Sequence, residues 1–247
     1  MAKLIFGLTI AWLCFVLFPH ATANAQMTGN SIYESTMPPG QIGHMQLMRR
    51  AEMRGYAQPV RLLAPGGASI SVFDGGAFHD LGSNDVVVGM FVGSVYRIKV
   101  TNIPGKPGME VFPSVEVINR MYPPAGLELK FPVEVHLDEE DLVTAANGAI
   151  VTRVVYLEDP DFAVPEQQER DLQPYFDVGP ARDPLHVAQQ LGRPMAIVRG
   201  GAITPDNLDI NEFAFGGPPV QFFQQFATQY REGRRSTEPV TLQDFNR

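Results

Sequence analysis

The chain is poor in cysteine and tryptophan, with one residue of each. The cysteine, Cys14, and the tryptophan, Trp12, both fall within the first 25 residues. The rest of the chain therefore has no disulfide, no thiolate zinc ligand and no cysteine nucleophile. A domain without such crosslinks must be stabilised by a buried core, and the remaining residues, roughly 220 of them, are enough to form one.

Basic residues are also in the minority. The chain has 19 lysines and arginines against 27 aspartates and glutamates, a net charge of −8. Lys3 is the only charged residue in the first 25, so the remainder has 18 basic and 27 acidic residues and a net charge of −9. Because nothing in the sequence forms a basic patch that would neutralise phosphates, we do not expect a nucleic-acid partner.

The first 25 residues have the organisation of a secretory signal. Lys3 precedes an uncharged apolar run over residues 4–18, and Ala23-Asn24-Ala25 follows it with small residues at both positions that a signal peptidase reads. This order predicts a signal peptide over residues 1–25, cleaved before Gln26, with Ala21-Thr22-Ala23 as a second possible cleavage site. The run is shorter than the roughly 20 residues that span a membrane. We expect an exported protein, periplasmic or at the cell surface, with no membrane span after cleavage.

Residues 26–57 are predicted to be a flexible N-terminal segment, because their first part is polar and contains two prolines. Ile42, Met45 and Met48 then recur near helical spacing. This spacing indicates a possible short helix over residues 41–54.

Residues 58–200 read as a β-rich domain. Apolar and polar residues alternate, as where Tyr96 and Ile98 are interleaved with Arg97 and Lys99, and this period of two predicts strands with one solvated face. Seven or eight such strands are separated by glycine and proline turns. Among these turns, Gly66-Gly67 and Gly75-Gly76 are predicted to be hairpin turns.

Two short helices are predicted in the connections. Asp138 is a suitable N-cap for a helix over residues 139–147, and Asp183 followed by Pro184 is a suitable start for a second helix. The fold class predicted is mainly β, an antiparallel sandwich, with an immunoglobulin-like or barrel-like arrangement as the alternative. Residues 201–247 are predicted to be a C-terminal tail, either partly disordered or with one docking helix over residues 220–231.

Several strings in residues 55–200 resemble a group of exported planctomycete-type bacterial proteins of unassigned function. They are GMFVGSVYR at 89–97, GMEVFP at 108–113, YPP at 122–124, FPV at 131–133, TRVVYLEDP at 152–160 and LGRP at 191–194. The resemblance implies a shared exported β-rich domain and a bacterial envelope setting. It supplies no catalytic residues, because the strings consist of turns and strands.

Two clusters could bind a metal ion. Asp206, Asp209, Asn211 and Glu212 provide the oxygen ligands that calcium prefers, although the cluster lacks the glycine of an EF-hand loop, and an exposed acidic loop is the alternative. His44, Met45 and Met48 provide the imidazole and thioether ligands that copper accepts, although methionines at helical spacing also pack against cores. No resident cofactor is predicted.

Catalytic patterns are weak. No Gly-x-Ser-x-Gly motif occurs, and the acidic run from Asp138 to Asp141 is explained by its place at a helix N-terminus. His136 and Asp138 share a strand face, which permits a ligand pair or a solvated surface pair.

The sequence alone does not assign a molecular function. The hypothesis it favours is a non-catalytic binding or structural module of the bacterial envelope, with one or more envelope proteins as partners. A periplasmic protein that binds calcium or copper is the alternative. A hydrolase has the least support.

Overall fold

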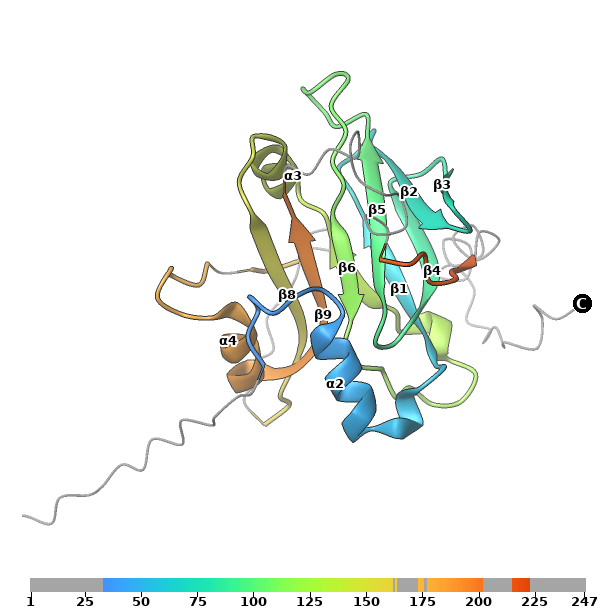
Figure 1. Cartoon of the computed structure of the whole chain (residues 1–247), viewed down its shortest axis with the longest axis vertical. Coiled ribbons are helices and arrows are strands. Elements are labelled where there is room, and N and C mark those ends of the chain that lie inside the picture. Colours follow the sequence, from blue (N-terminus) through green and yellow to red (C-terminus); the bar gives the residue numbers. More distant parts are fainter. Residues whose placement is uncertain (1–32, 162, 164–172, 176, 202–214, 223–247) are drawn as a thin grey trace, which may run out of the picture. The chain divides into compact units, whose positions relative to one another are not determined.

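The computed structural model describes residues 33–161, 163, 173–175, 177–201 and 215–222 (Figure 1). The predicted signal peptide lies outside these residues. The strands in the described part of the chain assemble into two sheets, one of four strands and one of six.

The smaller sheet has the strand order β10-β4-β1-β7. Its members are β1 (Ala57–Leu63), β4 (Asp85–Phe91), β7 (Val133–His136) and β10 (Gln221–Phe222). β4 runs antiparallel to β1 and β10, whereas β7 runs parallel to β1. β7 and β10 are therefore the two edges of this sheet.

The larger sheet has the strand order β3-β2-β5-β6-β9-β8. Its members are β2 (Ser69–Asp74), β3 (Ala77–Asp80), β5 (Val95–Thr101), β6 (Ser114–Val117), β8 (Val151–Glu158) and β9 (Gly192–Gly200). All neighbouring strands run antiparallel. β3 and β8 are the two edges.

The prediction of a mainly β, antiparallel sandwich is confirmed, and the sheets do not close into a barrel. Alternate residues of both sheets form one apolar cluster between them. Leu62 of β1, Ile70 of β2 and Ile98 of β5 belong to it, and none of the three is exposed to solvent. The core therefore consists of the apolar half of the alternating pattern.

The two glycine turns differ. Gly75 and Gly76 join β2 to β3 in a two-residue hairpin, with φ angles of 58° and 92° that suit a type I′ turn. Gly66-Gly67 leads from β1 in one sheet to β2 in the other. The hairpin predicted at this second turn is wrong, because local turn chemistry does not determine which sheet the next strand joins.

Three α-helices lie in the described residues: α2 (Gln41–Arg49), α3 (Glu139–Ala146) and α4 (Pro184–Leu191). Two single-turn 3₁₀ helices, η1 (Ala51–Met53) and η2 (Glu128–Lys130), accompany them. α3 joins β7 to β8 and α4 precedes β9, so the two helices predicted in connections are present. None of the described helices combines the length and apolarity needed to cross a bilayer.

α2 covers the outer face of the larger sheet (Figure 1, blue). The backbone N–H of Gly43 donates to the Glu116 carboxylate of β6 at 2.8 Å, and Ile42 is fully buried in a second apolar cluster with Ile118 and Ile197. The approach is close: a Cβ added to Gly43 would lie 2.7 Å from the Cα of Gly93. A glycine at this helix position therefore lets α2 contact the sheet backbone.

Two charged strand residues are buried. Glu116 has no solvent exposure and accepts a bond of 2.7 Å from Nη1 of Arg199. Arg97, predicted to face solvent, is 8% exposed, and its Nη1 donates to the carbonyl oxygen of Phe112 at 2.7 Å. Burial lowers the pKa of Arg97 to about 10. The solvated-face prediction is wrong here, because segments distant in sequence cover the outer face of the larger sheet.

Candidate functional site

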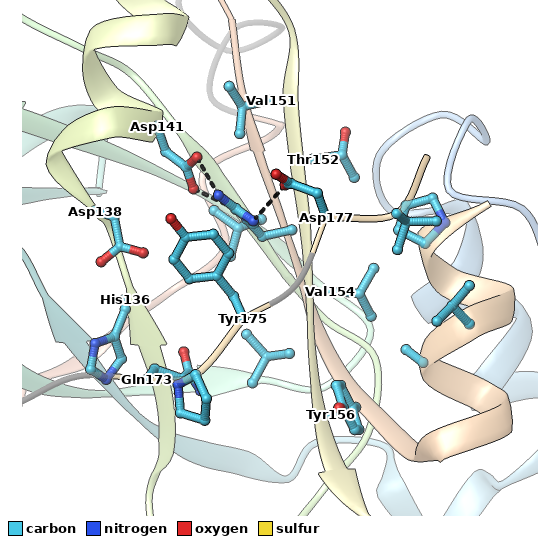
Figure 2. Close-up of a pocket in the computed structure, with 18 of the residues that line it drawn as sticks. His136, Asp138, Asp141, Val151, Thr152, Val154, Tyr156, Gln173, Tyr175 and Asp177 are labelled. Atoms are coloured by element: carbon cyan, nitrogen blue, oxygen red, sulfur yellow. Dashed lines mark hydrogen bonds and ion pairs between the residues drawn. The ribbon is translucent and has the colours of Figure 1, made fainter. Parts of the chain in front are cut away.

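A cleft opens along β8, the edge strand of the larger sheet (Figure 2). Its volume is about 630 Å³, within the range of ligand-binding sites. The lining comes from the whole of β8, His136 at the end of β7, the α3 region from Asp138 to Thr144, residues 173–175, 177 and 178, and the start of α4.

β8 is half-buried along its length. Val151 and Val155 pack against the core between the sheets. Val154 packs on the other face, against the second apolar cluster, which contains Ile42 of α2 and Leu185 of α4. None of the eight residues of β8 is fully buried. Its inner edge pairs with β9, but no strand within the described part of the chain pairs with its outer edge. Among the described residues, the backbone donors and acceptors of this outer edge are therefore not used by a further strand.

Arg153 is the central cation of the cleft. Its Nε and Nη2 donate to the two carboxylate oxygens of Asp141 at 2.6 and 2.7 Å, and its Nη1 lies 3.7 Å from Oδ1 of Asp177. The guanidinium carbon lies 4.2 Å from the ring centroid of Tyr175, and the Tyr175 hydroxyl donates to Oε2 of Glu140 at 3.4 Å. These contacts join α3, β8, Tyr175 and Asp177 around one charge.

Asp138 occupies the N-cap position of α3 but its side chain makes no capping hydrogen bond. Asp183 in the same position of α4 accepts from the backbone N–H groups of Leu185 and His186. The Asp138 carboxylate points into the cleft, near Tyr175 (Figure 2). Partial burial, and then the negative charge of Asp141, raise its pKa. The cleft therefore holds a half-buried carboxylate with no hydrogen-bond partner among the described residues.

A second series of interacting charged side chains ends at the cleft. His136 Nε2 lies 3.9 Å from the carboxylate of Glu134, which also accepts from Arg61 at 3.0 Å. Arg61 in turn binds Asp85 of β4 through two hydrogen bonds of 2.9 and 2.7 Å. The contact with His136, and then the bond from Arg61, hold the pKa of Glu134 below its usual value. His136 is thus held by a partner outside the cleft.

The cleft carries an excess of negative charge. Among the described residues, five acidic side chains line it against one arginine: Asp138, Glu140, Asp141, Glu158 and Asp177. Apolar groups lie among these charges, because Ile150 is 85% exposed and Tyr175 is 51% exposed. A ligand that carries positive charge and apolar surface fits this lining.

The copper hypothesis concerned His44, Met45 and Met48, which all lie on α2. His44 is exposed and Met48 is 71% exposed, whereas Met45 is partly buried against the cluster that contains Ile42. The methionine spacing thus places one thioether against the protein and the other towards solvent. The copper hypothesis stays a prediction.

The calcium candidates Asp206, Asp209, Asn211 and Glu212 lie outside the described residues, so the calcium hypothesis also stays a prediction. Within the residues that are described, no group of three or more histidines, cysteines, aspartates or glutamates is arranged to hold a metal ion.

The structure brings together His136 and Asp138, which the sequence offered as a possible pair, because both line the cleft. Sequence reasoning missed Arg153, Asp141 as its partner, Tyr175 and Asp177. An arginine in the middle of the most β-prone run was the one local signal for them, because a charge there needs a partner.

The chain matches no protein-family model, and no curated protein and no solved structure matches it either.

Proposed function

We propose that this chain is a non-catalytic binding module exported to the bacterial envelope, and that it captures an extended cationic peptide segment of a partner protein along β8. The observation that carries the proposal is the eight-residue edge strand beside the cleft, with no strand on its outer side in the described residues. Such an edge accepts an added strand through main-chain hydrogen bonds.

The composition of the cleft supports a peptide with alternating residues. Side chains of a strand added to β8 would alternate between the two faces of the larger sheet. One set would lie beside Asp138, Asp141 and Tyr175, and the other beside α4. Lysine or arginine in the first set would compensate the excess negative charge, and apolar residues would cover Ile150.

Asp138 is the residue we expect to discriminate between peptides. Its carboxylate loses hydration in the cleft and gains no protein hydrogen bond among the described residues. A cationic side chain would provide the missing partner, and a charge-assisted hydrogen bond in a partly desolvated site contributes roughly 1.5–3 kcal/mol.

The groups of the cleft also support a non-catalytic role. Two threonines, Thr144 and Thr152, supply aliphatic hydroxyl groups to its lining. Arg153 is neutralised by Asp141, and His136 contacts Glu134 rather than a nucleophile. A nucleophile positioned by its base is what acyl transfer would require.

Export rests on the first 25 residues and on the resemblance of residues 55–200 to exported planctomycete-type proteins. N-terminal sequencing of the protein recovered from a periplasmic or culture fraction tests it. We expect the sequence to begin at Gln26. A full-length chain confined to the cytoplasm would overturn this part of the proposal.

Binding is tested by calorimetry with ten-residue peptides in which lysine alternates with valine. Two sets of peptides are the matched probes. In the first, glutamate replaces lysine. In the second, the lysine peptide is N-methylated at alternate backbone positions, along one edge of the peptide strand or along the other. We expect the lysine peptide to bind and the glutamate peptide to bind at least about tenfold more weakly, and N-methylation of one edge to abolish binding because it removes the ladder donors.

The variant Asp138→Asn should weaken the lysine peptide about tenfold, whereas Glu110→Gln, which removes an exposed charge beside Lys99, should have little effect. Equal affinity for lysine and glutamate peptides would contradict the charge assignment. Equal affinity for both N-methylated forms and the parent peptide would contradict strand addition.

A further inference from the structure

Two arginines and two tyrosines form a stack at the end of the sandwich opposite α3, here called the arginine–tyrosine stack. The Arg120 guanidinium carbon lies 3.7 Å from the ring centroid of Tyr56 and 4.5 Å from that of Tyr122. The Arg193 guanidinium carbon lies 5.6 Å from the same Tyr122 ring. The four side chains come from the residue before β1, the segment after β6 and the start of β9.

These two arginines differ from Arg61, Arg153 and Arg199. Arg61, Arg153 and Arg199 each hold a carboxylate at 3.0 Å or closer. Arg120 and Arg193 have no carboxylate within ion-pair distance among the described residues. Arg120 and Arg193 therefore combine two positive charges at one place with no acidic partner among the described residues.

Stacking fixes the orientation of a guanidinium without consuming its hydrogen bonds. The attraction lies between the face of the cation and the face of the ring, so the N–H groups at the edge of the guanidinium stay directed outward in its own plane. Among the edge groups of Arg120, Nε contacts the carbonyl of Met121 at 3.4 Å. The planar fork that remains matches a carboxylate, which accepts two parallel bonds.

Tyr122 connects the two forks and is 52% exposed. Both guanidinium carbons lie within 6 Å of its ring centroid, so one ligand can reach both charges and the ring edge together. The exposed edge of the Tyr122 ring offers apolar contact to the C–H groups of a sugar ring. A ligand with repeated carboxylates on sugar rings uses both parts of the stack.

We propose that the arginine–tyrosine stack binds an acidic polysaccharide, with the carboxylates of its uronic-acid units held by Arg120 and Arg193 and a sugar ring against Tyr122. None of the four side chains of the stack lines the cleft along β8, and the proposal does not depend on the function proposed for that cleft.

The carboxylate of Glu128 lies near the Tyr56 side of the stack and makes that side less favourable for an anion. Burial raises the pKa of Tyr56, the positive charge of Arg120 lowers it, and the negative charge of Glu128 raises it by a smaller amount. Glu128 is beyond ion-pair distance of both guanidinium groups. Its charge disfavours an anion on the Tyr56 side, so the ligand's carboxylates are directed to the Tyr122 side.

The test is calorimetric titration of the whole exported chain with an oligogalacturonate, beside a neutral maltooligosaccharide of equal length and a polyglutamate peptide. We expect the oligogalacturonate to bind and the other two to bind at least about tenfold more weakly. The variants Arg120→Gln and Arg193→Gln should each weaken the oligogalacturonate about tenfold, because each removes a charge-assisted fork. Arg120→Lys should recover little, because lysine keeps the charge but not the planar fork.

Arg182→Gln is the matched control, because it removes an exposed positive charge outside the stack, and the circular dichroism spectrum shows whether each variant is folded. Arg193→Gln keeps the test valid should Arg120→Gln fail to fold. The proposal is overturned if polyglutamate or the neutral oligosaccharide binds as tightly as the oligogalacturonate. It is also overturned if Arg182→Gln and Arg193→Gln weaken binding equally. Asp138→Asn, which alters the β8 cleft, should leave this affinity unchanged.

Discussion

β6 and β8 belong to the same sheet, with β9 between them, yet their surroundings are opposite. β6 has four residues, carries Glu116, and is buried at every position. β8 has eight residues from the most β-prone run of the chain and is fully buried at none. The difference lies in what covers each strand: α2 lies over β6, whereas β8 borders a cleft. Intrinsic propensity determines that a strand forms, and tertiary cover determines what the strand can do.

The difference in cover between β6 and β8 is tested most strongly by removing the acidic partner from one ion pair at each strand. Glu116→Ala leaves Arg199 without its carboxylate beneath α2, and we expect a loss of about 3–5 kcal/mol in the free energy of unfolding. Asp141→Ala removes the partner of Arg153 in the open cleft and should cost about 1 kcal/mol or less. Urea unfolding measures both, and equal losses would mean that the two strands are equally covered.

The cover itself can be displaced. In Gly43→Ala the new methyl group would meet the backbone of Gly93 at 2.7 Å, so α2 must move away from the sheet. We expect a loss of about 1–3 kcal/mol. Gly66→Ala, where an added Cβ meets nothing within 4 Å, should change stability by about 0.5 kcal/mol or less. Thermal unfolding of both variants tests this, and a neutral Gly43→Ala would show that α2 contributes little.

A third comparison uses the same side chain in both strands. Val115 of β6 is fully buried, so Val115→Ala should cost about 1.5 kcal/mol or somewhat more. Val154 of β8 is only partly buried, and Val154→Ala should cost less than about half as much. Chemical denaturation of the two variants compares them directly, and a larger loss at Val154 would place the structural centre of the sheet at β8.

The two N-cap aspartates should respond to pH with opposite sign. Asp183 loses hydration, but the bonds from Ser35, His186 and Leu185 outweigh this and lower its pKa. Its contribution is therefore present above the ordinary pKa of 3.8 and is lost as the pH falls through the lower folded value. Asp183→Asn should be less stable than the parent at pH 7, with the difference shrinking towards pH 3.

For Asp138 the pKa is raised, so its ionised form destabilises the folded state. Asp138→Asn should therefore be more stable than the parent at pH 7, and the difference should disappear below the ordinary pKa of 3.8, where both states bind the proton. Urea midpoints at pH 7 and pH 3 measure both variants. A stabilising effect of Asp183→Asn at pH 7, or a destabilising one of Asp138→Asn, would reverse the assignment.

The sequence predicted the features whose causes are local. The turn at Gly75-Gly76 and the capped start of α4 at Asp183 depend on residues within a few positions of one another. Burial of Glu116 was not predictable, because the bond that explains it comes from Gly43, 73 residues earlier.

The candidate site was predictable only in fragments for the same reason. His136 and Asp138 attracted attention as a pair two residues apart, and both line the cleft. The role of Arg153 in the site was not predicted, because its partners Asp141 and Tyr175 come from other segments of the chain. The alternation of apolar and polar residues predicted that β8 is a strand. It did not predict that β8 lies at the edge of the sheet, because edge strands and central strands can show the same alternation.

The contact between Ser35 and Asp183 has a consequence for synthesis. Both the backbone N–H and the hydroxyl of Ser35 bond to one carboxylate oxygen that lies 148 residues later in the chain. At roughly 5–20 residues per second, the N-terminal segment exists for about 7–30 s before the residue that fastens it has been made. The segment around Ser35, just before α2, therefore gains this bond only after most of both sheets has been synthesised.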